Sequence, residues 1–371
     1  MRGNNILGLI FANMSKNSIR EIARSRTMGS IPFGGRYRLI DFPLSNMANS
    51  GINKVGVVVN GNYRSLLNHI GSGKPWDLSR RNDGLFILPP ISGNAEDFDN
   101  KVKAIFAIRE FINDSKEEYV LLCDCDTVCN INYADILKRH IENNADITIV
   151  YKNGTLPQKI IKPVVISEKN EDKISNIIIN PEIDYECDYG LNMYLINKGI
   201  LSNVIEECMS RNEVDFERDF IQKNIKRFNI YGYKFEGFSS MITSSDAYFE
   251  SNMAMMKEDV RIELFDYSRP IYTKVRDDMP ARYGSESNVK NSLISNGCIV
   301  EGEVYNSILF KGVHIKRGAK VSNCIIMQDT EIGEHCRLDY AMIDKNTIIR
   351  SGRSMMGFAS YPIYIGKSSV V

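Results

Sequence analysis

The sequence predicts two architectures in one chain: an α/β domain with a mixed, mostly parallel sheet, followed by a parallel β-helix. Two observations carry this prediction. Apolar segments typical of buried strands alternate with helical segments through most of the chain. The C-terminal part instead repeats a short motif rich in β-branched residues at a nearly fixed interval. We expect an α/β domain over residues 1–255, a linker over 256–286 and a β-helix over 287–371.

The composition is that of an ordinary globular protein and argues against several function classes. The chain has 371 residues, enough for two domains, with 43% hydrophobic and 25% charged residues. The formal net charge is zero and both signs are intermingled, so no nucleic-acid or membrane partner is expected. No apolar run reaches the roughly 18 residues of a membrane span, and MRGNN lacks a signal-peptide core. Eight scattered cysteines favour a reducing compartment, and we expect the cytoplasm.

The elements of the α/β domain follow from hydrophobic periodicity. Strands are expected at Ile6–Ala12, Lys54–Val59, Tyr119–Cys123, Asp146–Tyr151, Leu191–Ile196 and Ile230–Phe235, with short strands between Val164 and Asn180. Helices are expected at Met47–Ser50, Tyr63–Ile70, Val102–Ile112, Tyr133–Asn143, Lys198–Cys208, Phe216–Lys226 and Ser244–Met256. Ligands of such open sheets bind at the carboxyl ends of the strands. The candidate site therefore lies at the loop after Ala12, at Asn60–Gly61 and at Asp124–Asp126.

The β-helix prediction depends on four similar motifs. They begin at Asn291, Asn306, Asn323 and Tyr340, at intervals of 15, 17 and 17 residues. Between them, glycines mark expected corners: Gly297, Gly302, Gly312, Gly318 and Gly333. A fixed period with short β-branched runs predicts about four triangular coils. A β-sandwich would instead show strict alternation and hairpin turns.

The residues at the predicted sheet edge give a mixed signal. A carboxylate after a buried strand is the usual anchor for a divalent cation on a triphosphate, and Asp126 is the best candidate, with Asp124 beside it. Alternatively, one of these carboxylates caps the following turn at Asn130–Asn132. The first loop, Asn13–Ser18, contains no glycine, although a phosphate-binding loop needs glycines so that backbone N–H groups can approach the phosphate.

Two further groups of residues suggest ligand chemistry. Arg36 and Arg38 alternate after a Gly-Gly pair and form a basic pair suited to a phosphate, although surface ion pairs fit the spacing equally well. Cys123, Cys125 and Cys129 do not have the spacing of a zinc site, which favours buried thiols.

The motif PFGGRYRLIDFPLSN, followed by NSGINKVGVVV, HIGSG, WDL and ILPP, resembles bacterial glucose-1-phosphate adenylyltransferase, also called ADP-glucose pyrophosphorylase. The resemblance covers nearly the whole chain. It implies a Rossmann-like nucleotide-sugar transferase domain followed by a left-handed β-helix. It also implies a tetramer that uses Mg²⁺, is controlled by sugar-phosphate effectors, and converts ATP and glucose 1-phosphate into ADP-glucose and pyrophosphate for glycogen synthesis.

The resemblance also assigns the active-site positions, and most of them are replaced here. The family loop A-G-G-x-G-x-R-L falls on residues 12–19, where all three glycines are lost and Ser18 replaces the arginine. Met28 replaces the lysine of A-K-P, and Asn180 replaces the lysine of E-K-P. Met241 replaces the second metal-binding aspartate. The nucleotide-proximal segment G-T-A-D-A falls on residues 100–104.

Two functional positions are retained. Asp126 keeps the aspartate of S-G-D-H as a vestigial metal and nucleotide position, and Arg36 occupies a basic position that lies in the effector site of related enzymes. Phosphoryl-type transfer is catalysed mainly by positioning and charge stabilisation, so the combined losses predict very low activity. The pattern resembles the D-type regulatory subunits of the family. This implies a hetero-oligomer with a catalytic subunit, which would hold the Mg²⁺.

Three alternatives remain open. The chain could be an active adenylyltransferase with a rebuilt site that uses Lys16, Lys101 or Lys103. It could be a sugar-phosphate or nucleotide sensor without a partner. It could also be an acyltransferase built on the β-helix, although no histidine is placed convincingly for that chemistry.

Overall fold

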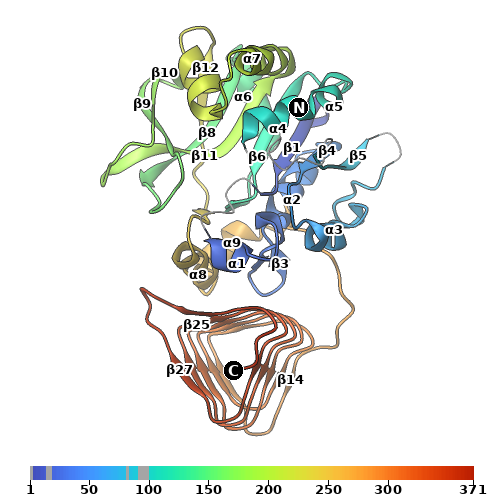
Figure 1. Cartoon of the computed structure of the whole chain (residues 1–371), viewed down its shortest axis with the longest axis vertical. Coiled ribbons are helices and arrows are strands. Elements are labelled where there is room, and N and C mark those ends of the chain that lie inside the picture. Colours follow the sequence, from blue (N-terminus) through green and yellow to red (C-terminus); the bar gives the residue numbers. More distant parts are fainter. Residues whose placement is uncertain (1–2, 14–18, 81–82, 91–99) are drawn as a thin grey trace.

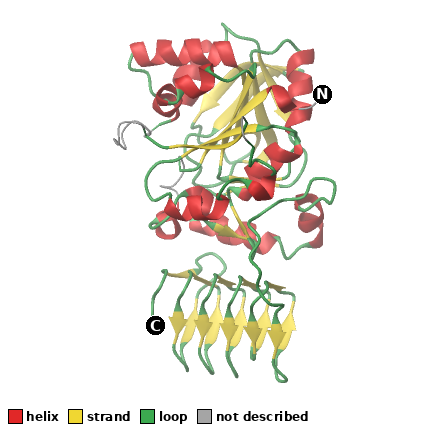
Figure 2. Ribbon diagram, turned by 90° about the vertical axis from the view of Figure 1, so that its right-hand side faces the viewer, coloured by secondary structure: helices red, strands yellow, loops and turns green. Residues whose placement is uncertain are grey.

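The structure is a computed structural model that describes residues 3–13, 19–80, 83–90 and 100–371. It has two parts, an α/β domain and a triangular β-helix (Figure 1). The coils of the β-helix stack side by side below the α/β domain (Figure 2), so the side of the prism, and not its end, faces the sheet domain. The predicted fold class is thereby confirmed.

A nine-stranded mixed sheet forms the centre of the α/β domain, in the order β5-β4-β1-β6-β11-β8-β12-β10-β9. Its strands are β1 (Ile6–Phe11), β4 (Lys54–Val58), β5 (Gly84–Leu88), β6 (Tyr119–Asp124), β8 (Ile147–Thr155), β9 (Val164–Asn170), β10 (Lys173–Ile179), β11 (Glu186–Asn197) and β12 (Ile230–Lys234). Strands β5, β4, β1 and β6 run parallel, whereas β11 runs antiparallel to both β6 and β8. Strands β1, β4 and β6 have nearly all of their residues buried, as expected for strands covered on both faces, whereas the edge strand β5 is mostly half-buried.

Helices cover both faces of this sheet (Figure 1). They are α1 (Arg20–Ala23), α2 (Asp41–Asn49), α3 (Arg64–Ile70), α4 (Lys101–Ala107), α5 (Arg109–Asn113), α6 (Tyr133–Glu142), α7 (Lys198–Ser210), α8 (Ser245–Ala254) and α9 (Glu258–Leu264). Helices α4, α5 and α7 share one core cluster, and α2 and α6 share the other. No helix in the described part of the chain is long and apolar enough to cross a membrane.

Several shorter elements complete the domain. They are the 3₁₀ turns η1 (Gly3–Asn5), η3 (Met28–Ser30), η4 (Lys74–Trp76) and η7 (Gln222–Asn224), the π-helical turn η6 (Phe216–Ile221), and the short strands β2 (Pro32–Phe33), β3 (Tyr37–Arg38), β7 (Thr127–Cys129) and β13 (Ser239–Met241). Strands β2 and β3 form a hairpin, and β13 pairs with β7 beside the main sheet.

Some predicted boundaries are wrong for identifiable reasons. Helix α2 begins at Asp41 and not near Met47. Pro43 does not prevent this earlier start, because it lies in the first helical turn, where its missing N–H group is not needed. The predicted helix over Val102–Ile112 is divided at Ile108 into α4 and α5. Strand β5 is absent from the predicted strands, and α9 falls inside the predicted linker.

The β-helix consists of three parallel five-stranded sheets, and so has five coils where about four were expected. The sheets are β14 (Arg282–Tyr283), β17 (Ile299–Val300), β20 (His314–Ile315), β23 (Glu331–Ile332) and β26 (Ile348–Ile349); β15 (Asn288–Lys290), β18 (Glu303–Tyr305), β21 (Lys320–Ser322), β24 (Arg337–Asp339) and β27 (Ser354–Met356); and β16 (Leu293–Ile294), β19 (Ile308–Leu309), β22 (Ile325–Ile326), β25 (Ala341–Ile343) and β28 (Ile363–Ile365). The four sequence motifs stack in register in the last of these sheets. The fifth coil was missed because β28 does not follow the motif.

A ladder of asparagines holds one corner of the β-helix. The amide of Asn291 donates to Asn306 at 2.9 Å, Asn306 donates to Asn323 at 2.6 Å, and Asn323 donates to Asp339 at 2.8 Å. The three asparagines have φ between 43° and 50°, a left-handed conformation that asparagine tolerates better than most residues. The motif thus begins with asparagine for two reasons, its backbone conformation and its side-chain hydrogen bonds.

The side of the β-helix shares a core with the α/β domain. Ile308, Phe310, Ile325, Met327 and Met342 lie in the same buried cluster as the hairpin β2–β3 and helix α8. The segment that carries the PFGG motif is therefore packed between the sheet and the β-helix.

We predict that Asn306→Ala destabilises the β-helix by about 2–4 kcal/mol, because it removes two ladder hydrogen bonds and places alanine in the left-handed region. Asn306→Gly should cost about 1 kcal/mol less, since glycine adopts this conformation freely. Urea unfolding followed by circular dichroism measures both losses. A loss in the glycine variant equal to or larger than that in the alanine variant would contradict the role of backbone conformation.

Candidate functional site

The carboxyl edge of β1 meets the neighbouring strand ends, as expected for an open sheet. The Asn13 side chain donates to the carbonyl of Asn60 at 2.5 Å and accepts from the Met28 N–H at 3.4 Å. Residues 14–18, including Lys16 and the predicted phosphate-loop position Ser18, lie outside the described residues. Met28 is 1% exposed and belongs to the core, so its thioether packs where the family's lysine would present a charge.

Met241 lies next to the turn that carries Asp126. Met241 pairs with Thr127 across β13 and β7, and the N–H of Ile242 donates to the Asp126 carbonyl at 2.7 Å. The Asp126 carboxylate accepts from the Thr127 hydroxyl at 3.2 Å and from the Asn192 amide at 3.2 Å. The sequence analysis missed Asn192. Its φ of 56° lies where the pairing of β11 with β8 is interrupted, a local irregularity without a clear signal in the sequence.

These residues do not fit a Mg²⁺ ion held by two carboxylates. Mg²⁺ requires hard oxygen ligands, and a thioether does not supply one, so Met241 removes the second point of attachment beside Asp126. Within the described ranges, no group of three or more His, Cys, Asp and Glu side chains is arranged to hold a metal ion.

The expectation that Asp124 and Asp126 act as one pair is wrong. Strand β6 ends at Asp124, and the turn that follows sends the two carboxylates to different partners. Asp124 lies 2.9 Å from the Nζ atom of Lys101, which is also 3.3 Å from the Glu217 carboxylate. The expected cap at Asn130–Asn132 is not formed by either aspartate, because Asn132 caps α6 with its own side chain.

Burial and neighbouring charges shift the pKa values of Lys101 and Asp124 in opposite directions. Burial alone would lower the pKa of Lys101, but Asp124 and Glu217 outweigh it and raise that pKa well above its usual value. Burial raises the pKa of Asp124 to about 7, although Lys101 opposes the shift. Lys101 therefore stays charged and is engaged by carboxylates, so it does not replace a lost phosphate-binding residue. Lys103 lies two residues further along α4 and contributes its backbone N–H to the Asn100 cap.

Asn180 lies on an exposed turn. It follows β10 with a φ of 56°, its side chain is exposed, and its N–H donates to the Pro163 carbonyl at 2.9 Å. An asparagine amide at this position carries no charge with which to hold a sugar phosphate.

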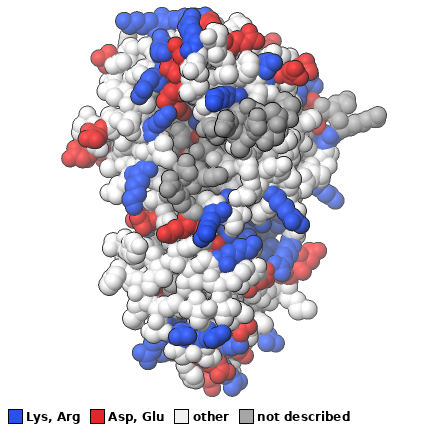
Figure 3. Space-filling view, in the orientation of Figure 1, with Lys and Arg blue, Asp and Glu red and all other residues white. Residues whose placement is uncertain are grey.

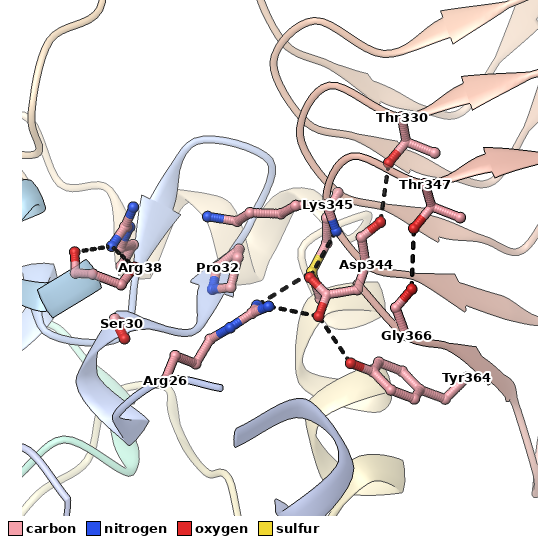
Figure 4. A network of polar contacts seen from close by, with 12 residues as sticks. Arg26, Ser30, Pro32, Arg38, Thr330, Asp344, Lys345, Thr347, Tyr364 and Gly366 are labelled. Atoms are coloured by element: carbon pink, nitrogen blue, oxygen red, sulfur yellow. Dashed lines mark hydrogen bonds and ion pairs between the residues drawn. The ribbon is translucent and has the colours of Figure 1, made fainter. Parts of the chain in front are cut away.

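A second polar centre lies where the two domains meet (Figure 4). Arg26 forms a buried ion pair with Asp344 at 2.6 Å, and Tyr364 donates to the same carboxylate oxygen at 2.8 Å. Lys345 extends between this pair and Arg38. The pKa of Lys345 is lowered to about 7 by burial and by the neighbouring charges of Arg38 and Arg26. Arg26 and Lys345 were not predicted from the sequence. The signal for Lys345 was a charged pair, Asp344-Lys345, directly after an apolar repeat, and Arg26 had no such signal.

Arg36 and Arg38 do not form the pair expected from their spacing. Arg38 turns toward α3, where it donates to the Ser65 carbonyl at 2.7 Å and to the Ser65 hydroxyl at 3.1 Å, and burial lowers its pKa to about 10. Arg36 is exposed and lines a cavity of about 490 Å³ together with Arg261, Arg276 and Lys311.

A larger cavity, of about 1270 Å³, lies at the same junction and is lined in part by Arg24, Lys159, Asp344, Tyr364 and Lys367. Lys and Arg side chains gather at the level where the two parts of the molecule meet (Figure 3). The junction, in contrast to the sheet edge, therefore keeps positive charge that is open to a ligand.

Comparison with known proteins identifies the family. The model of the family described as nucleotidyl transferase matches residues 17–258, and the model described as GlmU-like, C-terminal hexapeptide matches residues 277–358. The first match covers well over half of the chain.

The chain belongs to the nucleotidyl transferase family.

Its relatives carry two kinds of name. It is 34% identical to the "Glycogen biosynthesis protein GlgD" of Bacillus subtilis (strain 168), over 100% of this chain and 98% of the relative. It is 36% identical to the protein of the same name in Geobacillus stearothermophilus, over 86% and 83% of the two chains. It is 32% identical to a "Glucose-1-phosphate adenylyltransferase" of Clostridium perfringens (strain 13 / Type A), over 99% and 96%. The resemblance drawn from the sequence motifs is confirmed.

We predict that Arg26→Met destabilises this member of the family by about 3–5 kcal/mol, because it leaves Asp344 buried without its counter-charge. Asp344→Asn should cost less than Arg26→Met, and the double variant should recover part of the loss. Thermal and urea unfolding of the three variants form a double-mutant cycle. Losses that simply add would contradict a direct interaction between the two side chains.

Proposed function

We propose that this chain is a regulatory subunit of a glucose-1-phosphate adenylyltransferase, non-catalytic or weakly active by itself, that raises the activity of a catalytic partner in glycogen biosynthesis. The observation that carries the proposal is the contrast between a complete scaffold and a degenerate site. Met28 and Met241 are apolar and buried, and Asn180 is uncharged, at three positions where the resemblance implies charged groups. Asp126 is the vestige of the metal position, and Mg²⁺ would be held by the partner.

The size of the loss supports this proposal. Removing one donor that stabilises transition-state charge typically lowers turnover by about 10²–10³. This chain replaces two lysines and one metal-binding carboxylate at the described positions. Even with strong non-additivity, turnover by this chain alone should be very small. The alternative of a rebuilt active site loses support because Lys101 is engaged by two carboxylates.

The experiment that tests this function measures ADP-glucose synthesis by this chain, by the catalytic subunit, and by the two co-expressed. We expect no significant product from this chain, and more product from the mixture than from the same amount of catalytic subunit. Ordinary turnover by this chain alone would favour a rebuilt site. A mixture no faster than the catalytic subunit would favour a sensor without a partner.

We also infer that a phosphate-bearing effector, such as a sugar phosphate, binds at the domain junction. Arg36 was the candidate from the sequence, and its cavity contains three further basic side chains. The Lys345 cluster is a second candidate, because its ammonium lies near the guanidinium groups of Arg38 and Arg26, whose carboxylate neighbours are Asp41 and Asp344. An anion there would relieve the repulsion among the three cations.

The affinity for such an anion should fall as the pH rises above 7. The pKa of Lys345 is about 7 in the free protein, and a bound phosphate should raise it toward the unperturbed value near 10.4. Between these values the complex holds one proton more than the free protein, so binding weakens by up to about tenfold per pH unit. Calorimetric titration with a hexose phosphate from pH 7 to pH 9 measures this slope.

Lys345→Met should bind the ligand weakly and without this slope. Lys316→Met, which removes a half-buried lysine paired with Glu331 in another sheet of the β-helix, is the matched control and should keep the slope. Loss of binding in Arg36→Met but not in Lys345→Met would place the effector in the Arg36 cavity instead.

A further inference from the structure

Three charged side chains from distant parts of the sequence meet at the carboxyl end of β6. Lys101 is the first residue of α4, Asp124 is the last residue of β6, and Glu217 lies in the π-helical turn η6. The three side chains are only 8%, 6% and 14% exposed. They form one ion-paired group under the edge of the sheet where ligands of this fold bind.

The surroundings of Lys101 hold its ammonium group firmly in place. The Nζ atom lies 2.9 Å from Asp124 and 3.3 Å from Glu217, and it faces the rings of Tyr194 and Phe216 at 5.5 Å and 5.7 Å from their centroids. Carboxylates and aromatic faces are the two kinds of group that attract a cation. A lysine in the first position of a helix is disfavoured by the helix dipole, so these partners must offset that cost.

This arrangement lies at the end of β6, close to Asp126, the position where the resemblance implies a metal ligand. The strand end offers carboxylates, but Met241 lies beside Asp126, and Asp124 is already paired with an internal cation. One oxygen of Asp124 has no hydrogen-bond partner in the described part of the chain. Buried charges of this kind persist only when a counter-charge is present.

We propose that the Lys101 ammonium is a resident cation that takes the place of a divalent metal ion at the carboxyl end of β6, so that this edge binds neither a divalent cation nor its nucleoside triphosphate complex. The inference concerns this chain alone and holds whether or not a partner subunit is activated. Lys101, Asp124 and Glu217 carry a net charge of −1 when all are ionised, which repels a free triphosphate as well. The charges at this edge would thus exclude these ligands, in addition to the absence of the charged residues that the resemblance implies.

The test is a Mn²⁺ titration of the full-length chain, followed by electron paramagnetic resonance and by thermal unfolding. The wild type should bind no Mn²⁺ at millimolar concentration and should show no shift of its unfolding temperature. Stoichiometric Mn²⁺ binding by the wild type would overturn the proposal. The titration of the wild type requires no enzymatic activity.

The variant Lys101→Met should gain Mn²⁺ binding. It has a side chain of similar length but leaves Asp124 and Glu217 without their cation, so it should unfold at a lower temperature. Mn²⁺ should then restore part of the stability and bind at least about tenfold more tightly than to the wild type. Lys103→Met, on the same helix but outside the triad, should show neither effect. A Lys101→Met variant that folds and still ignores Mn²⁺ would also overturn the proposal.

If Lys101→Met does not fold, Lys101→Met combined with Glu217→Gln removes one of the two unpaired charges and serves in its place. That double variant should recover stability, because it leaves one uncompensated buried charge in place of two. Failure of these tests would leave the regulatory function untouched, since that function is measured by the activity of the partner.

Discussion

The buried contact between the PFGG segment and the side of the β-helix is the constraint on which the rest of the molecule depends. Arg26 reaches across the junction to Asp344, and apolar residues of the β-helix join the core of the α/β domain around the hairpin β2–β3. The same segment continues into α2, whose buried face packs under the sheet. A change in this segment therefore acts on both domains.

The sheet edge and the junction differ in charge. At the edge, Met28 and Met241 are buried, and Lys101 is paired with Asp124 and Glu217. At the junction, Arg36 lines an open cavity together with three further basic side chains, and Lys345 lies near Arg26 and Arg38. This distribution is consistent with the proposal that an anionic effector binds at the junction.

The sequence predicted the fold well because local patterns determine most of it. The spacing of Asn291, Asn306 and Asn323 reports the coil directly, since each asparagine stacks on the next. The resemblance implied that Met241 stands at the position of a second carboxylate, and in the structure Met241 pairs with Thr127, the neighbour of Asp126. The partners of Lys101 and of Arg26 were not predictable. In the sequence, these partners are separated from Lys101 or Arg26 by about 20 to more than 300 residues, and only tertiary packing brings them together. The same holds for Arg36 and Arg38, whose side chains diverge on the two sides of one hairpin.

The central claim is that this chain contributes its surfaces and not its active site. The most direct measurement is ADP-glucose synthesis by a purified hetero-oligomer in which the catalytic partner has lost its strand-end aspartate by substitution with asparagine, while this chain is unchanged. The account predicts no product above that of the inactivated partner alone. Product formed at a rate comparable to the normal hetero-oligomer would show that this chain carries catalysis, and would contradict the account.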